Sequence, residues 1–176
     1  MKIIAWIVAL MVLLVGGFFA LNAYIYEQKQ APSDYKAATY MIEGKPTTID
    51  GTTTRYFGNE LKTDLNGDGI TDIAFIITQS PGGSGTFYYA VGAVQDADGR
   101  YQGTDGYLLG DRIAPQTTNV SMNPAHKYVV VFNYADRAPG EPMTTRPSMG
   151  KSAYLKLVPE TMQWAIVVPD FEGESR

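Results

Sequence analysis

The chain has 176 residues, a formal net charge of −4 and no cysteine. The absence of cysteine excludes a disulfide scaffold, a cysteine nucleophile, a thiolate zinc site and a lipobox lipid anchor. The acidic balance, without any run of basic residues, excludes a typical nucleic-acid-binding protein.

Residues 1–26 predict a transmembrane signal-anchor helix. The stretch from residue 3 to residue 23 is uncharged, and at 1.5 Å per residue it spans a hydrocarbon core of about 30 Å. Trp6 lies near one end and Tyr24 and Tyr26 near the other, where interfacial aromatic residues belong. Lys2 lies on the short side, so we expect a single-pass membrane protein with a cytoplasmic N-terminus and an extracytoplasmic C-terminal domain.

A cleaved signal peptide is the alternative interpretation, and it exports the domain as well. Its apolar region usually runs about 7–15 residues and ends in a site with two small residues. Here the apolar run is longer, and the best candidate site, which ends at Ala23, lacks one of the two small residues. The pattern therefore favours an uncleaved anchor.

Residues 27–37 are polar and predict a linker, which is followed by a β-rich domain over residues 38–176. Turn signals separate short apolar segments that predict strands at 39–42, 46–49, 73–78, 86–94, 107–109, 119–122, 127–134, 153–158 and 163–168, with a further strand beginning at Tyr101. The spacing of about 8–12 residues predicts an all-β fold, either an antiparallel sandwich or a barrel. The β-branched run 73–78 is nearly continuous, so we expect it to be buried on both faces.

The segment 64–72, DLNGDGITD, has the spacing of a calcium loop. Oxygen donors fall at its first, third, fifth, seventh and ninth positions, which are Asp64, Asn66, Asp68, the backbone carbonyl of Ile70, and Asp72. Glycine occupies the sixth position, where a calcium loop turns sharply. Calcium prefers six to eight oxygen ligands, and without an ion three carboxylates would repel one another. The segment therefore predicts one structural calcium ion.

The loop differs from an EF-hand, because Phe75 occupies the twelfth position and a strand follows. It resembles the shorter calcium loop of integrin-type FG-GAP repeats, in which an aspartate at the ninth position completes the shell. The alternative is a polar Asn-Gly/Asp-Gly turn without an ion.

Two other segments invite a chemical interpretation. The glycine-rich stretch 81–85 lacks a following Gly-Lys-Ser/Thr and leads into a predicted strand, which favours a hairpin connection over a phosphate site. His126 is the single histidine of the chain and lies between a turn and a strand. A catalytic triad would have to be built around it, but the sequence has no G-x-S-x-G motif, so we interpret His126 as a turn residue.

Two Asp-Arg pairs stand at predicted strand ends. Asp111 and Asp136 could act as the two carboxylates of a glycosidase. Alternatively, Arg112 and Arg137 form loop salt bridges and backbone hydrogen bonds, which is the interpretation we favour. The proline-rich segment 138–148 predicts a long loop.

Tyrosine is abundant, and exposed tyrosine rings can stack on sugars. The candidates for such a platform are Tyr88, Tyr89, Tyr101, Tyr107 and Tyr134. Tyrosine is also a good strand former, so its abundance alone decides little.

Several motifs together resemble a family of small uncharacterised bacterial envelope proteins and lipoproteins. They are DLNGDG (64–69), GGSGTFYY (82–89), LLGDRIAPQ (108–116), NYADR (133–137) and EPMTTRPS (141–148). The resemblance covers about half the chain and implies an exported bacterial protein, without a known activity. Members with a lipobox cysteine differ from this chain, in which an apolar helix is expected to replace the lipid.

The combined prediction is a membrane-anchored extracytoplasmic β domain that binds one structural calcium ion. We expect it to be a non-enzymatic binding or interaction module of the bacterial envelope, with a glycan or protein partner and no nucleic acid. The alternative is a cell-wall glycan hydrolase that uses Asp111 and Asp136. A structural envelope protein that pairs through its helix is a third interpretation.

Overall fold

The computed structural model describes residues 11–22 and 31–169, which fall in two compact units, residues 1–31 and 32–176. Residues 11–22 form an α-helix in the first unit. Within the described ranges, no helix is both long enough and apolar enough to cross a membrane. The remainder of the predicted anchor, residues 1–10 and 23–26, lies outside the described residues.

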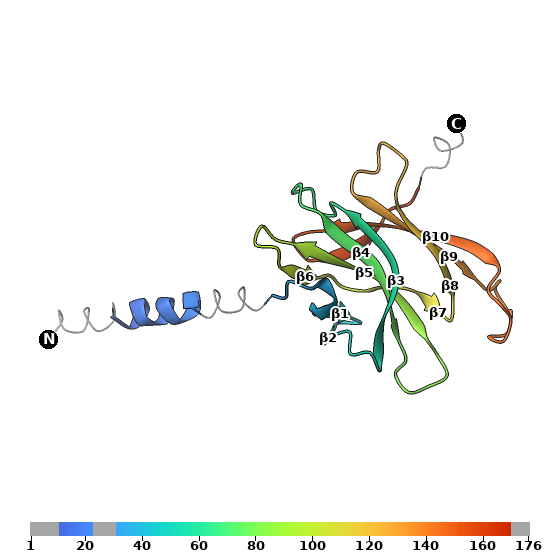
Figure 1. Cartoon of the computed structure of the whole chain (residues 1–176), viewed down its shortest axis with the longest axis horizontal. Coiled ribbons are helices and arrows are strands. Elements are labelled where there is room, and N and C mark those ends of the chain that lie inside the picture. The colour runs from blue at the N-terminus through green and yellow to red at the C-terminus, as the bar shows by residue number, and fades with distance from the viewer. Residues whose placement is uncertain (1–10, 23–30, 170–176) are drawn as a thin grey trace. The chain divides into compact units, whose positions relative to one another are not determined.

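The regular secondary structure described in the second unit consists of β-strands and one short 3-10 helix (Figure 1). Its elements are the 3-10 helix η1 (Tyr35–Ala37) and the strands β1 (Tyr40–Ile42), β2 (Lys45–Thr47), β3 (Thr54–Thr63), β4 (Asp72–Gln79), β5 (Phe87–Gln95), β6 (Tyr101–Gly103), β7 (Tyr107–Asp111), β8 (Ala114–Val120), β9 (Val129–Asp136), β10 (Met149–Val158) and β11 (Gln163–Ile166). The prediction of a fold made mostly of β-sheet is confirmed for the described residues.

The described strands form three antiparallel sheets. Sheet A is the β1–β2 hairpin, sheet B has the order β3-β4-β5-β6, and sheet C has the order β11-β10-β9-β8. Strands β6 and β7 pair one after the other with the same edge of β5. Residues 104–106 separate the two strands. At this interruption the backbone of Met41 in β1 bonds to Thr104 and Gly106, so sheet A adjoins sheet B there.

Sheet B is the middle layer of the domain, because both of its faces are buried. In β4, Ala74 and Ile76 point into a core shared with Phe132 and Leu155 of sheet C. The alternate residues of β4, which include Phe75, point into a second core with the N-terminal segment. All six residues from 72 to 77 are buried, which confirms the prediction that this strand is covered on both faces.

The N-terminal segment covers the second face of sheet B. The ring of Tyr35 packs edge-on against Phe75, with 5.3 Å between the ring centroids. Its hydroxyl donates to Glu60 Oε2 at 2.7 Å, and Tyr56 donates to the same oxygen at 3.0 Å. Residues 32–37, which were expected to belong to the linker, therefore pack as part of the domain.

Two strands differ most from the prediction. Strand β3 was not predicted, because Gly58 and Asn59 have positive φ angles and shift its register against β4. Strand β8 begins at Ala114, ahead of the predicted segment 119–122, and it contains Pro115. As the last strand of sheet C, β8 tolerates a proline because its outer edge has no strand partner in that sheet.

Candidate functional sites

The loop 64–72 joins β3 to β4 and is organised by the carboxylate of Asp64. One oxygen of Asp64 accepts the N–H groups of Asn66 at 3.2 Å and Gly67 at 2.6 Å, and the other accepts the N–H of Gly69 at 3.0 Å. Gly67 and Gly69 have φ angles of 88° and 82°. These left-handed conformations favour glycine, so the local sequence accounts for the tight reversal.

The middle of the loop consists of further local turns. Asn66 Oδ1 accepts the N–H of Asp68 at 3.0 Å, and Asp68 Oδ1 accepts the N–H of Ile70 at 2.7 Å. The Asn66 amide also donates to Asp68 Oδ2 at 2.9 Å. The side-chain oxygens of Asn66 and Asp68 thus each accept the N–H of the residue two positions further along the loop.

Asp72 closes the loop from inside the protein and is completely buried. Its two oxygens accept the N–H groups of Gln95 and Leu65, both at 2.8 Å. Burial raises the pKa of Asp72, and the nearby charges of Asp68 and Asp64 raise it further. The loop therefore concentrates negative charge around a buried carboxyl, and a bound cation would offset this repulsion.

The donor set fits a hard cation in chemical type, since its side-chain and backbone ligands are all oxygen. In the arrangement seen in residues 11–22 and 31–169, however, no three acidic or histidine side chains converge as a metal-binding group. The carboxylates of the loop instead accept local N–H groups, and an oxygen that accepts one hydrogen bond retains capacity for an ion. Calcium at Asp64, Asn66, Asp68, Ile70 and Asp72 stays a prediction.

Leu65 couples this loop to the hydrophobic core. It is 1% exposed, although its neighbours in the loop are polar. A β-carbon placed on Gly92 of β5 would lie 3.0 Å from both Leu65 and Trp164. Leu65 and Trp164 therefore both border Gly92 and belong to the same hydrophobic core.

The Asp111–Arg112 pair lies at the end of β7. The Arg112 guanidinium donates to Asp111 Oδ2 at 3.0 Å, and Asp111 Oδ1 accepts the backbone N–H of Thr86 at 2.8 Å. Burial acts to raise the pKa of Asp111, but these hydrogen bonds and the positive charge hold it below its ordinary value. Asp111 thus stays ionised and orders the end of the β4–β5 connection.

The Asp136–Arg137 pair orders the neighbouring loop. Lys151 donates to Asp136 Oδ2 at 2.7 Å, and this hydrogen bond lowers the pKa of Asp136. Arg137 donates to the carbonyls of Thr145 at 2.6 Å and Arg112 at 3.0 Å, so it joins the loop 138–148 to the turn between β7 and β8. A glycosidase requires one carboxylic acid with a raised pKa. The lowered pKa values of both aspartates favour the structural interpretation.

His126 lies in the turn before β9 and is half-buried. Its Nδ1 atom is 3.0 Å from Ser121 Oγ, and its ring packs edge-on against Tyr154. Within the described part of the chain, no carboxylate contacts the imidazole, so the third member of a triad is not found there.

The glycine-rich stretch 81–85 joins the antiparallel strands β4 and β5, as predicted for a hairpin.

The five tyrosines considered for sugar stacking do not form one exposed platform. Tyr89 and Tyr134 are buried. Tyr88 and Tyr107 pack against the core between sheets B and C, and Tyr101 packs against the core on the other face of sheet B.

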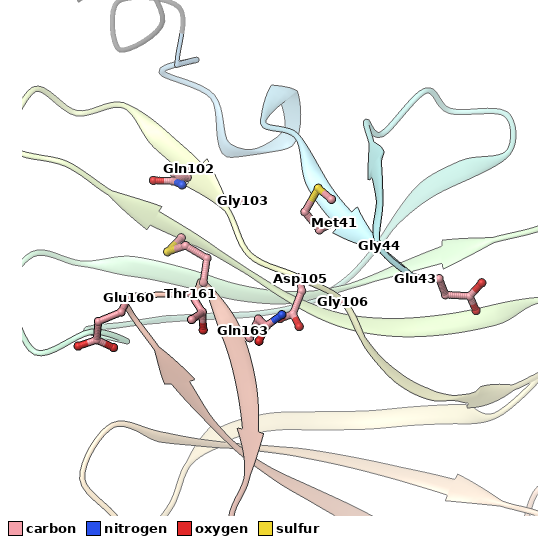
Figure 2. A pocket seen from close by; sticks show the side chains of 11 residues that line it. Met41, Glu43, Gly44, Gln102, Gly103, Asp105, Gly106, Glu160, Thr161 and Gln163 are labelled. Carbon is pink, nitrogen blue, oxygen red and sulfur yellow. The ribbon is translucent and has the colours of Figure 1, made fainter. Parts of the chain in front are cut away.

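A pocket that the sequence did not indicate lies where the three sheets meet (Figure 2). Its volume is about 580 Å³, and its walls come from the segments 41–44, 102–106 and 160–163. These segments are far apart in the sequence, and no motif connects them. Asp105 belongs to the interruption between β6 and β7, and its backbone N–H donates to Met162 at 2.9 Å. No sequence signal distinguishes Asp105 from an ordinary loop aspartate.

No protein-family model, curated protein or solved structure matches the chain. The resemblance to bacterial envelope proteins and to FG-GAP loops therefore stays a prediction from short motifs.

Proposed function

We propose that this chain is a membrane-anchored, extracytoplasmic β domain with one structural calcium ion in the loop 64–72, and that it serves as a non-enzymatic binding or interaction module of the bacterial envelope. The observation that carries the calcium assignment is the completely buried carboxylate of Asp72 at the ninth position of a loop with oxygen donors in register. A cation there would offset the mutual repulsion of Asp64, Asp68 and Asp72.

The anchor is supported by the uncharged stretch from residue 3 to residue 23, which is long enough for a hydrocarbon core of about 30 Å. The anchor and its orientation are tested by adding protease to sealed spheroplasts and to lysed ones, with detection of a C-terminal tag. Digestion of the domain in sealed spheroplasts supports an extracytoplasmic domain, and protection until lysis contradicts it. Release of the domain into the medium indicates a cleaved signal peptide.

The calcium site is tested on the full chain in a non-ionic detergent. The chain has two tryptophans, so Trp6→Phe leaves Trp164 as the single tryptophan reporter. Because Leu65 and Trp164 both pack around Gly92, calcium in the loop should alter Trp164 emission and raise the unfolding midpoint. At a calcium concentration ten times the dissociation constant, the stabilisation should be about 1.4 kcal/mol.

The variant Asp68→Ala removes an exposed ligand from the loop and should abolish both responses. Asp98→Ala is the matched control, because Asp98 is also an exposed aspartate, in an Asp-Ala-Asp-Gly turn without the further donors of a calcium loop. If the parent protein does not respond to millimolar calcium, or if both variants respond alike, the calcium assignment is wrong.

A further inference from the structure

The pocket at the junction of the three sheets has the size of a small-molecule site. Its volume of about 580 Å³ lies within the range of about 300–1,000 Å³ typical of ligand pockets. The turn of sheet A, the interruption between β6 and β7, and the turn between β10 and β11 form its walls. It shares no residue with the loop 64–72, so it is independent of the calcium proposal.

All of the charged residues that line this pocket are acidic. Glu43, Asp105 and Glu160 line it, and none of the lining residues is lysine, arginine or histidine. Figure 2 shows Glu43 and Glu160 toward opposite ends of the pocket, with Asp105 between them. Such a cavity repels anions and attracts cations.

Asp105 is the ordered carboxylate of the pocket. Its Oδ1 atom accepts the backbone N–H of Trp164 at 2.9 Å, which fixes the orientation of the side chain. In the described ranges its Oδ2 atom receives no hydrogen bond, and the side chain has no cationic partner. Burial raises the pKa of Asp105, and the hydrogen bond from the Trp164 N–H offsets this only in part.

The rest of the lining suits an organic cation better than a metal ion. The acidic side chains of the pocket do not converge as a metal-binding group, and a divalent ion such as calcium requires about six or more oxygens around one point. The side chains of Met41 and Met162 add apolar, adaptable surface. An alkyl chain can pack on such surface while its ammonium group reaches Asp105.

We propose that this pocket binds an alkylammonium group, with Asp105 as its hydrogen-bonded counter-ion and Glu43 and Glu160 contributing negative potential. The group belongs either to a free amine or to a lysine side chain of a polypeptide.

The test uses the full chain in a non-ionic detergent, with calcium present to saturate the loop 64–72. Titration calorimetry measures binding of 1,5-diaminopentane, with 1-pentanol as the uncharged analogue. A short unstructured peptide with lysine, and its norleucine counterpart, distinguish the polypeptide source. We expect saturable binding of the diamine that weakens as salt is added, and no binding of the alcohol.

Asp105→Asn is the informative variant, because asparagine keeps an Oδ1 acceptor for the Trp164 N–H and loses the charge. We expect it to weaken diamine binding by about tenfold or more. Asp98→Asn makes the same change of charge at an exposed position outside the pocket and should leave affinity within about twofold.

Glu160→Gln provides a second variant at an exposed position of the rim, in case Asp105→Asn does not fold. Its expected effect is a loss of about two- to threefold, with a smaller dependence on salt. The proposal is overturned if the diamine does not saturate the parent protein, if the alcohol binds equally well, or if folded Asp105→Asn keeps the parent affinity. Repeating the titration with Asp68→Ala separates this result from the fate of the calcium site.

Discussion

The carboxylate of Asp72 accepts the backbone N–H of Leu65 at 2.8 Å, and this hydrogen bond joins the two ends of the loop 64–72 inside the core. The second oxygen of Asp72 binds the N–H of Gln95 on β5. The last residue of the candidate calcium loop is therefore also a structural member of sheet B.

Replacement of Asp72 should destabilise the protein even without calcium. In Asp72→Ala, the N–H groups of Leu65 and Gln95 lose their acceptor, and each unsatisfied group costs about 1–3 kcal/mol. Asp68→Ala is the control, because Asp68 is exposed and its loss should have little effect in the absence of calcium. Urea unfolding in the presence of a chelator measures both. Equal destabilisation by the two variants would contradict the role of Asp72 in the core.

A methyl group added to Gly92 should overpack the core beside the loop. Its β-carbon would lie 3.0 Å from atoms of Leu65 and Trp164 and 3.1 Å from Thr104, and overpacking of this kind costs about 1–3 kcal/mol. Gly150→Ala is the matched control in β10, because its β-carbon meets no atom within 4 Å. Thermal unfolding should show a lower midpoint for Gly92→Ala and almost no change for Gly150→Ala. A tolerated Gly92→Ala would mean that Leu65, Trp164 and Thr104 can move apart to make room for a methyl group.

Arg137 should hold the proline-rich loop 138–148 in place. Arg137→Lys replaces the separate Nε and Nη1 donors to Thr145 and Arg112 by a single ammonium group, and the loss should be about 0.5–1.5 kcal/mol for each hydrogen bond that is not re-formed. Hydrogen exchange at the Thr145 amide, which donates to Pro142 at 2.9 Å, should become faster. The exposed Arg146 of the same loop provides the control Arg146→Lys, for which exchange should not change.

The ion pair between Asp136 and Lys151 should contribute to stability in a pH-dependent way. The hydrogen bond from Lys151 lowers the pKa of Asp136 in the folded protein. The stabilisation is therefore present above the unfolded pKa of about 3.9, and it is lost as the pH falls through the lower folded value. Both side chains are partly exposed, so the difference between the parent and Asp136→Asn should be at most about 1 kcal/mol at neutral pH.

Asparagine is chosen for that test because its Oδ1 atom can still accept the Arg137 N–H. Urea unfolding over a pH series measures the difference between the two proteins. It should shrink toward zero in acid. A difference that is independent of pH would indicate a packing effect instead of an ionic one.

The strands that were predicted well are those whose own residues indicate whether the strand is buried. The run 73–78 is β-branched and nearly continuous, and β4 is buried on both faces. Strand β3 was not predicted, because it contains charged residues such as Glu60 and Lys62. A bulge at Gly58 and Asn59 also interrupts its alternating pattern. That bulge is stabilised by pairing with β4, which is a contact between distant residues. The first part of β8 was missed for a related reason, since only the position of the strand at the edge of sheet C makes Pro115 acceptable there.

The sequence by itself determined the β-rich class of the domain and the turn geometry of the loop 64–72, because these depend on residues within a few positions of one another. Gly69 permits the reversal, and the side chains of Asp64, Asn66 and Asp68 bond to backbone groups two to five residues away. Only the tertiary structure decided that Asp72 is buried, that Arg137 reaches the turn between β7 and β8, and that Asp105 lies in a pocket with residues from 41–44 and 160–163. The reason is physical: burial and the charge around a carboxylate arise from the packing of segments far apart in the chain, and a local pattern carries no information about that packing.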